Sequence, residues 1–142
     1  YGASRRQHVT ELINPSLASG QPVISDRYAD STVAYQGVGR GPGIEMTQAV
    51  NDIAVGGTLP DLTICLDLAV KIVSTRRIAR GGKEDRLEQA GSSLQQLVRD
   101  AFLGMAADDD QWLLVDASAD ELSVHETIWS ALQTRFPAFP FT

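Results

Sequence analysis

Short apolar segments alternate with longer segments of helical periodicity, and this alternation limits the possible folds more than any other feature. Residues 62–66 and 112–115 are too short for helices and are rich in apolar residues with high strand propensity. A third short segment, 22–25, runs straight into a charged loop. Each segment is followed by a helical pattern, and such alternation predicts a parallel sheet with right-handed crossovers. We therefore predict an α/β fold with strands over these three segments.

The helical patterns have recognisable ends. Val9, Leu12, Ile13 and Leu17 recur at helical spacing before Ser19-Gly20, where glycine suits a left-handed cap. The stretch Ser118-Ala119-Asp120-Glu121 has the form of a capping box that opens the last helix. We predict the other helices over Ile44–Val55, Val70–Arg80 and about Glu84–Ala107. The residues expected to face inward on the last two long helices are Leu94, Leu97, Val98, Ala101 and Met105, then Leu122, Ile128, Trp129 and Leu132.

Composition excludes several classes of protein. The 142 residues carry a net charge of −6, which argues against nucleic acid as a partner because such proteins need a basic face. No apolar run approaches the roughly 18 residues of a membrane span, so no membrane partner is expected. The single cysteine, Cys65, allows no intrachain disulfide, which favours a reducing, cytoplasmic location.

The segment after the first short strand combines charged, hydroxyl, amide and glycine residues in a way that packing does not require. It reads Asp26-Arg27-Tyr28-Ala29-Asp30-Ser31-Thr32-Val33-Ala34-Tyr35-Gln36-Gly37-Val38-Gly39-Arg40-Gly41. Loops at the carboxyl ends of strands commonly carry ligand chemistry in α/β proteins. We therefore predict a binding site here. A purely structural ion pair between Asp26 and Arg27 is the alternative interpretation of those two residues.

A second concentration of charge surrounds Gly81-Gly82. Ten of the twelve basic residues are arginine, and the planar guanidinium fork suits phosphate recognition. Codon bias in a GC-rich genome would explain the arginine content equally well. A solvated helix end is the alternative interpretation of the cluster. The two histidines, His8 and His125, have no neighbouring ligand pattern, so no metal site is predicted. The cluster consists of Arg76, Arg77, Arg80, Lys83 and Arg86.

The loop 26–41 resembles the phosphate-acceptor loop of bacterial thymidylate kinases. Segments 3–9, 60–68 and 85–88 also match that family in order, so the resemblance covers essentially the whole chain. It implies a three-layer P-loop nucleoside monophosphate kinase fold, with a lid at about 76–90. The sequence contains no Gly-x-x-x-x-Gly-Lys-Ser/Thr. We therefore expect residues 1–142 to be the C-terminal portion of a single kinase domain, lacking the N-terminal strands of its parallel sheet. The first missing strand would lie between 22–25 and 62–66.

The resemblance implies transfer of a phosphoryl group from MgATP to dTMP, in a cytoplasmic homodimer. It makes Arg27 the ligand of the acceptor phosphate, with Asp26 orienting it or the magnesium-bound water. Arg5 would reach the thymine carbonyl edge or the phosphate. Thr32 and Gln36 would pair with the pyrimidine, and Tyr35 would pack on deoxyribose. The expected catalytic residues are Arg27, Arg80 and Arg86, and the expected ATP-binding residues are Arg76, Arg80 and Ser118.

Three alternatives remain at this point. The capping box explains Ser118 without any ligand. A kinase for another nucleoside monophosphate fits less well than a thymidylate kinase because Thr32, Tyr35 and Gln36 together match the thymidylate pattern. A non-catalytic nucleotide-binding or dimerisation module is the alternative outside the enzymes. Without a phosphate-binding Lys-Ser/Thr pair, we expect this chain alone to have negligible activity.

Overall fold

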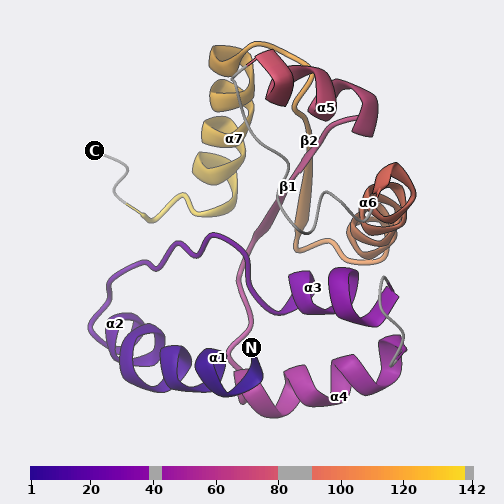
Figure 1. Ribbon diagram of the computed structural model, residues 1–142. Helices are drawn as coiled ribbons and strands as arrows, with labels where there is room; N and C mark the ends of the chain where they lie inside the picture. Colours follow the sequence, from indigo (N-terminus) through magenta and orange to yellow (C-terminus); the bar gives the residue numbers. More distant parts are fainter. Residues whose placement is uncertain (39–42, 80–90, 140–142) are drawn as a thin grey trace. The chain divides into compact units, whose positions relative to one another are not determined.

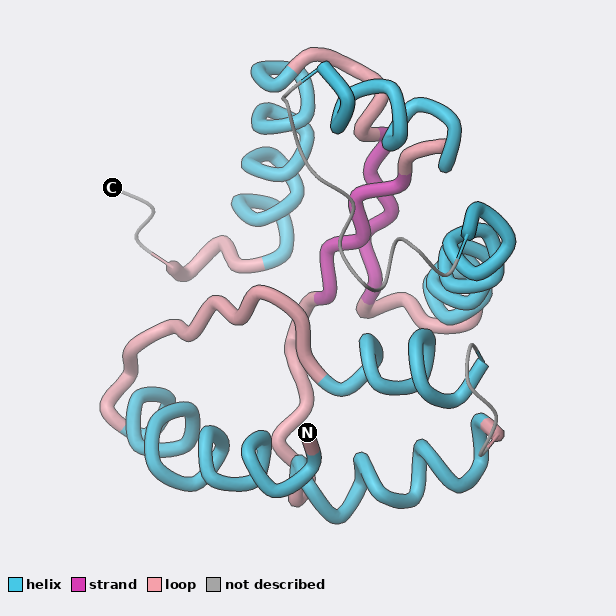
Figure 2. Tube along the Cα trace, in the orientation of Figure 1, coloured by secondary structure: helices cyan, strands magenta, loops and turns pink. Residues whose placement is uncertain are grey.

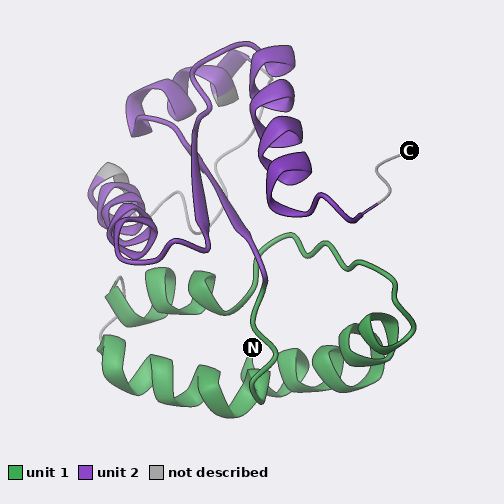
Figure 3. Ribbon diagram, turned by 180° about the vertical axis from the view of Figure 1, so that it is seen from behind, with its two compact units in different colours: residues 1–60 green, residues 61–142 purple. Residues whose placement is uncertain are grey.

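The computed structural model describes residues 1–38, 43–79 and 91–139, and these residues form two compact units. Unit 1 comprises Tyr1–Pro60 and unit 2 comprises Asp61–Thr142 (Figures 1 and 3). Unit 1 is helical in its described residues, whereas unit 2 contains the strands (Figure 2).

Unit 1 begins with helical residues that continue without a break from Gly2 to Ala18. They comprise α1 (Gly2–His8), the π-helical segment η1 (Val9–Ile13) and α2 (Asn14–Ala18). The wider π turn ends at Ile13, two residues before Pro15, whose ring would clash with the carbonyl of the residue four positions earlier in a regular helix. The helix ends before Gly20, which has a φ of 78°. The predicted helix and its glycine end are confirmed.

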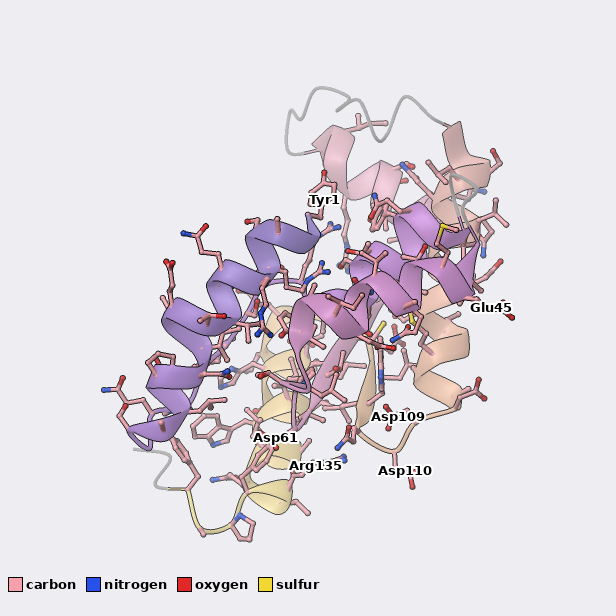
Figure 4. All side chains as sticks on the ribbon, turned by 90° about the horizontal axis from the view of Figure 1, so that it is seen from below. Tyr1, Glu45, Asp61, Asp109, Asp110 and Arg135 are labelled. Atoms are coloured by element: carbon pink, nitrogen blue, oxygen red, sulfur yellow. The ribbon has the colours of Figure 1, made fainter. Side chains whose placement is uncertain are left out.

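The second half of unit 1 contains α3 (Ala29–Thr32), the π-helical segment η2 (Val33–Val38) and α4 (Ile44–Val55). The structure confirms the predicted bounds of α4, which ends at Gly56 in the left-handed conformation with a φ of 58°. Glu45 lies in the first turn of α4, and its exposed side chain extends outward (Figure 4). Its carboxylate is well placed to interact with the positive end of the helix dipole.

The core of unit 1 is built from small and β-branched side chains. Val9 and Ala34 are fully buried, and Val55 is 2% exposed. Gly37 packs so closely on α4 that an added Cβ would lie 3.2 Å from Thr47 Oγ1. Of the four apolar residues at helical spacing on the first helix, Val9 and Ile13 are buried, but Leu12 and Leu17 are 50% and 45% exposed. Only part of this apolar pattern therefore contributes to the core.

The strand predicted over 22–25 is wrong. Residues 21–25 have no regular secondary structure, and Ile24 is 98% exposed. A strand forms only when its backbone donors and acceptors pair with a neighbouring strand. The described residues of unit 1 contain no such strand, so the apolar segment 22–25 has no pairing partner there.

Unit 2 contains a parallel pair of strands, β1 (Thr63–Asp67) and β2 (Trp112–Asp116). The register pairs Thr63 with Trp112 and Asp67 with Asp116, so the two aspartates lie at the same end of the pair. The two predicted strands and their parallel direction are confirmed. β1 begins one residue later than predicted, and both strands end one residue later than predicted, at an aspartate.

Three helices accompany the strands of unit 2: α5 (Val70–Ala79), α6 (Gly91–Ala107) and α7 (Glu121–Arg135). Helices α6 and α7 lie on opposite sides of the strand pair (Figures 1 and 3). The prediction for α5 is confirmed as far as Ala79, and that for α6 from Gly91 onward; the predicted residues 80 and 84–90 lie outside the described residues.

The start of α7 corrects the predicted capping box. Asp120, not Ser118, is the N-cap, and its Oδ1 accepts hydrogen bonds from the backbone N–H groups of Leu122 and Ser123. An aspartate directly before the first helical residue satisfies the unpaired donors without help from Ser118.

The inward faces of α6 and α7 are less buried than predicted. Val98 is 6% exposed, but Leu97 is 50%, Leu122 64% and Trp129 38% exposed. The helices therefore bury only part of their apolar stripes against the two strands. In the part of the chain that the structure describes, no helix is both long enough and apolar enough to cross a membrane.

Candidate functional site

Arg5 is the centre of the polar cluster in unit 1. Its Nη2 donates to Thr32 Oγ1 at 2.7 Å and to the Tyr28 carbonyl at 3.2 Å. Its Nη1 donates to Asn51 Oδ1 at 2.7 Å. These three hydrogen bonds join α1, the start of the predicted acceptor loop and α4. The structure thus brings together two of the predicted substrate-binding residues, Arg5 and Thr32.

Asn51 is a member of this cluster that sequence reasoning missed. Its side chain is 1% exposed, and its Nδ2 donates to the Ala29 carbonyl at 2.9 Å. A buried amide must find hydrogen-bond partners, so an asparagine among the apolar residues of α4 was the available signal. That signal names no partner, because the contact to Arg5 spans 46 residues of sequence.

Tyr28 is also part of this cluster and contacts Arg5. Its hydroxyl donates to the Thr58 carbonyl at 2.9 Å, and the Arg5 guanidinium carbon lies 5.8 Å from its ring centroid. Burial raises the pKa of the Tyr28 hydroxyl above its ordinary value. The hydroxyl therefore stays protonated at neutral pH, as the hydrogen bond to Thr58 requires.

Arg27 has an unusual backbone conformation. Its φ is 66°, and it is the one non-glycine residue with a positive φ among those described. Such a conformation is strained for a residue with a side chain and often marks a functional site. Ser25 Oγ donates to the Arg27 carbonyl at 2.9 Å, which supports the turn. The exposed guanidinium lies 5.2 Å from the ring centroid of Tyr35. Two predicted substrate-binding residues are thus neighbours.

The other two predicted residues of this loop are placed less specifically. Asp26 is exposed, and within the described residues it forms no ion pair with Arg27. The alternative of a structural pair between these residues is therefore not supported. Gln36 is half-buried in η2, together with Tyr35.

In unit 2, Arg76 and Ser118 are brought together. The Arg76 guanidinium donates through Nη1 to the Ala117 carbonyl at 2.9 Å and through Nη2 to the Ser118 carbonyl at 3.1 Å. Asp116 Oδ1 accepts the Ser118 N–H at 2.8 Å, and hydrogen bonding with Ser118 lowers the pKa of Asp116. Arg76 thus holds the loop that follows β2, and its fork is directed at backbone carbonyls.

A second pair missed from the sequence joins β1 to α6. Arg99 donates through Nε to Asp67 Oδ1 at 2.6 Å and through Nη2 to Asp67 Oδ2 at 2.8 Å. This two-point hydrogen bonding lowers the pKa of Asp67. The Asp67 carbonyl also accepts the Ala117 N–H at 2.8 Å. The carboxyl end of β1 is therefore tied both to α6 and to the loop that follows β2.

Arg80 and Arg86, the expected catalytic residues of the lid, lie outside the described residues and remain predictions. Residues 39–42 of the acceptor loop, including Arg40, lie outside them as well. Within residues 1–38, 43–79 and 91–139, no group of three or more His, Cys, Asp or Glu is arranged to hold a metal ion.

The two clusters offer different chemistry. Unit 1 presents guanidinium, hydroxyl, amide and aromatic groups on one loop and two helices, a combination that can bind a phosphorylated planar base. Unit 2 presents a tied backbone loop at the carboxyl ends of parallel strands, where α/β proteins commonly bind ligands.

The chain is similar in sequence to known proteins over nearly its whole length. A family model described as thymidylate kinase matches residues 1–128. A thymidylate kinase of Deinococcus radiodurans is 41% identical over 136 residues, which are 95% of this chain and 66% of that protein. One from Magnetococcus marinus is 42% identical over 94% of this chain and 64% of that protein. One from Leuconostoc mesenteroides is 46% identical over 83% of this chain and 56% of that protein. The chain thus spans less than two thirds of the length of these relatives.

Proposed function

From the premise that the chain belongs to the thymidylate kinase family, we propose that the complete protein transfers the γ-phosphoryl group of ATP to dTMP. An oxygen of the dTMP phosphate attacks the γ-phosphorus, the bond to the β–γ bridging oxygen breaks, and dTDP and ADP are released. Catalysis of such transfers consists mainly of positioning the reactants and neutralising charge. The single observation that carries the proposal is the Arg5–Thr32–Asn51 cluster, which ties the acceptor loop to α1 and α4.

On the acceptor side, we assign the phosphate to Arg27. Its guanidinium is exposed at a strained turn and can bind two phosphate oxygens in parallel. Tyr35, whose ring lies beside this guanidinium, packs on the deoxyribose. Asp26 forms no ion pair with Arg27 among the described residues, so we assign it to orienting a water molecule near the bound phosphate. This arrangement would hold the attacking oxygen in place.

The pyrimidine is recognised by groups on α1, α3 and η2. Arg5 donates to a thymine carbonyl, and its hydrogen bonds to Thr32 and Asn51 fix the plane of the guanidinium. Thr32 Oγ1 accepts a hydrogen bond from Arg5, so the Thr32 hydroxyl hydrogen can itself be donated to the base. Gln36 supplies an amide to the base edge. Guanidinium and hydroxyl donors favour a base that presents a carbonyl, as thymine does.

On the ATP side, we assign Ser118 and its loop to the adenine. Arg76 supports this loop by donating to the Ala117 and Ser118 carbonyls, so its contribution to ATP binding is indirect. Arg80 and Arg86 neutralise the charge on the transferred phosphoryl group, together with Arg27. This role follows from the family resemblance of the arginine-rich segment alone.

Magnesium accompanies ATP in the proposed reaction and would neutralise charge on its phosphates. The described residues contain no group of three or more His, Cys, Asp or Glu arranged around a metal ion, and no step is assigned to a magnesium ion held by this part of the chain. We further propose a cytoplasmic location, which a single unpaired cysteine favours. A homodimer is proposed from the family resemblance.

The proposal predicts a clear substrate preference. The complete protein should phosphorylate dTMP much faster than dCMP, because cytosine presents an amino group where thymine presents a carbonyl to Arg5. It should also prefer dTMP to dUMP. Initial rates with each monophosphate, and with pairs in competition, measure this preference at a fixed concentration of MgATP.

Equal rates with all three monophosphates would remove the thymidylate assignment and favour a kinase of broader specificity. No phosphoryl transfer to any monophosphate, with dTMP still bound, would favour a non-catalytic nucleotide-binding module. Both outcomes are distinguishable from a misfolded preparation by the circular dichroism of the same sample.

A further inference from the structure

We propose that Asn51 is a positioning residue for acceptor recognition, acting through the Arg5 guanidinium. The proposal rests on the proposed function, in which Arg5 contacts the acceptor base. Asn51 lies on α4 and makes none of the substrate contacts assigned above. Its role is to set the plane in which Arg5 presents its remaining donors.

The hydrogen-bond partners fix the orientation of the Asn51 amide. Arg5 Nη1 can only donate, so the group facing it at 2.7 Å must be the amide oxygen. The Ala29 carbonyl can only accept, so the group facing it at 2.9 Å must be the amide nitrogen. A flipped amide would place donor against donor and acceptor against acceptor. One orientation therefore serves both partners.

The amide connects three elements at once. Its oxygen is bound to α1 through Arg5, and its nitrogen is bound to the first residue of α3 through Ala29. Arg5 in turn bonds to Thr32 in the last turn of α3. Asn51 and Arg5 therefore hold α3 at both of its ends, and the acceptor loop continues directly from α3 into η2.

Burial makes this arrangement sensitive to substitution. Asn51 is 1% exposed and Ala29 is 7% exposed, so water has little access to replace the lost hydrogen bond to Ala29. Arg5 is half-buried, and its bond to Asn51 is partly shielded from water. Thr47, one turn earlier on α4, is 5% exposed and donates to the Gly43 carbonyl of its own helix start. It is a matched control, because it has similar burial and one hydrogen bond, and among the described residues it forms no hydrogen bond with Arg5 or α3.

The test uses the variants Asn51→Leu, Asn51→Asp and Thr47→Val in the complete protein. Asn51→Leu keeps the branching and the number of heavy atoms of the side chain, although leucine is somewhat larger, and it removes both hydrogen bonds. We expect its kcat/KM for dTMP to fall about tenfold or more, as for loss of a buried hydrogen bond to a charged group. Its ratio of kcat/KM for dTMP to that for dCMP should fall as well, while the KM for ATP stays unchanged. Thr47→Val should keep the wild-type ratio.

Asn51→Asp separates the two bonds and also covers the case in which Asn51→Leu does not fold. The carboxylate still accepts from Arg5 but cannot donate to Ala29. We expect its dTMP-to-dCMP ratio to stay within about threefold of wild type, a difference of well under 1.4 kcal/mol. A ratio that collapses in a folded Asn51→Asp protein would overturn the role of the Arg5 contact.

A spectroscopic measurement keeps this proposal separate from the proposed function. The Arg5 Nε–H resonance, assigned with Arg5→Lys, should shift in Asn51→Leu and remain in place in Thr47→Val. A shift with no dTMP kinase activity in the wild-type protein would reject the proposed function alone. Wild-type kinase activity with an unchanged resonance and an unchanged substrate ratio in folded Asn51→Leu would reject the positioning role alone.

Discussion

At the scale of single residues, the candidate site depends on two arginines whose conformations are restricted by the surrounding residues. Arg5 is held by three hydrogen bonds, and Arg27 has a strained backbone. The first feature fixes the direction of a guanidinium before any ligand arrives, which lowers the entropic cost of binding. The strained backbone of Arg27 holds its guanidinium at the surface, on a turn that an arginine rarely adopts without support from neighbouring residues.

Two substitutions of Arg27 separate its side chain from its backbone. Arg27→Ala removes the guanidinium but keeps a Cβ at a φ of 66°, whereas Arg27→Gly removes both the guanidinium and the strain. We expect both variants to bind dTMP weakly in calorimetry. In chemical denaturation, Arg27→Gly should have a free energy of unfolding about 1 kcal/mol higher than Arg27→Ala, because glycine adopts positive φ readily. Equal stabilities would mean that the turn relaxes without glycine.

At the scale of helices and strands, the sequence predicts best where the pattern is local. The bounds of α4 and the identities of β1 and β2 follow from periodicity and from Gly56. The segment around Ile24 could not be predicted in the same way, because an apolar segment becomes a strand only beside a partner. The N-cap of α7 is Asp120 and not Ser118. The sequence could not distinguish the two, because serine and aspartate are both favoured N-cap residues.

The functional residues likewise divide into those that a local motif predicts and those whose contacts join residues far apart in the sequence. The family resemblance of the acceptor loop and the first helix predicts Arg5, Thr32, Arg27 and Tyr35 as site residues. The structure places Arg5 beside Thr32 and Arg27 beside Tyr35. Asn51 and the Asp67–Arg99 pair were missed. Their contacts span 46 and 32 residues of sequence, and no local pattern encodes such distances.

The Asp67–Arg99 pair makes the joint between β1 and α6 dependent on pH. Arg99 lowers the pKa of Asp67, so the stabilisation is complete above the ordinary aspartate pKa of about 3.9 and is lost as pH falls through the lower, folded-state pKa. Asp67→Asn should therefore lower the free energy of unfolding at pH 7 and reduce its decline in acid. Urea denaturation across this range measures both effects.

Asp61→Asn is the control for that experiment. Asp61 is an exposed carboxylate just before β1 and has the same chemistry as Asp67. It should leave the acid profile close to that of the wild type. Parallel acid profiles for Asp67→Asn and the wild type would show that the ion pair contributes no stability, as is common for partly exposed pairs.

At the scale of the whole molecule, the family assignment gives the chain the P-loop nucleoside monophosphate kinase fold, and the two units bury little apolar surface for that fold. Val98 and Val115 are the buried apolar residues of unit 2 among those described, and its sheet pairs only β1 with β2 there. A two-stranded sheet has marginal stability by itself. Many large apolar side chains are exposed, including Ile24, Met46 and Ile53.

These features lead to a prediction for nucleotide binding by residues 1–142. The acceptor cluster of unit 1 is formed, so dTMP should bind, but weakly, because part of the binding energy must offset the ordering of a marginally stable chain. ATP should not bind detectably. The sequence has no Gly-x-x-x-x-Gly-Lys-Ser/Thr to surround its phosphates, and Arg76 is directed at backbone carbonyls. Calorimetric titration with each nucleotide tests both expectations, with Arg5→Lys as the control for dTMP. Micromolar binding of ATP would show that residues 1–142 hold a phosphate site that this account does not contain.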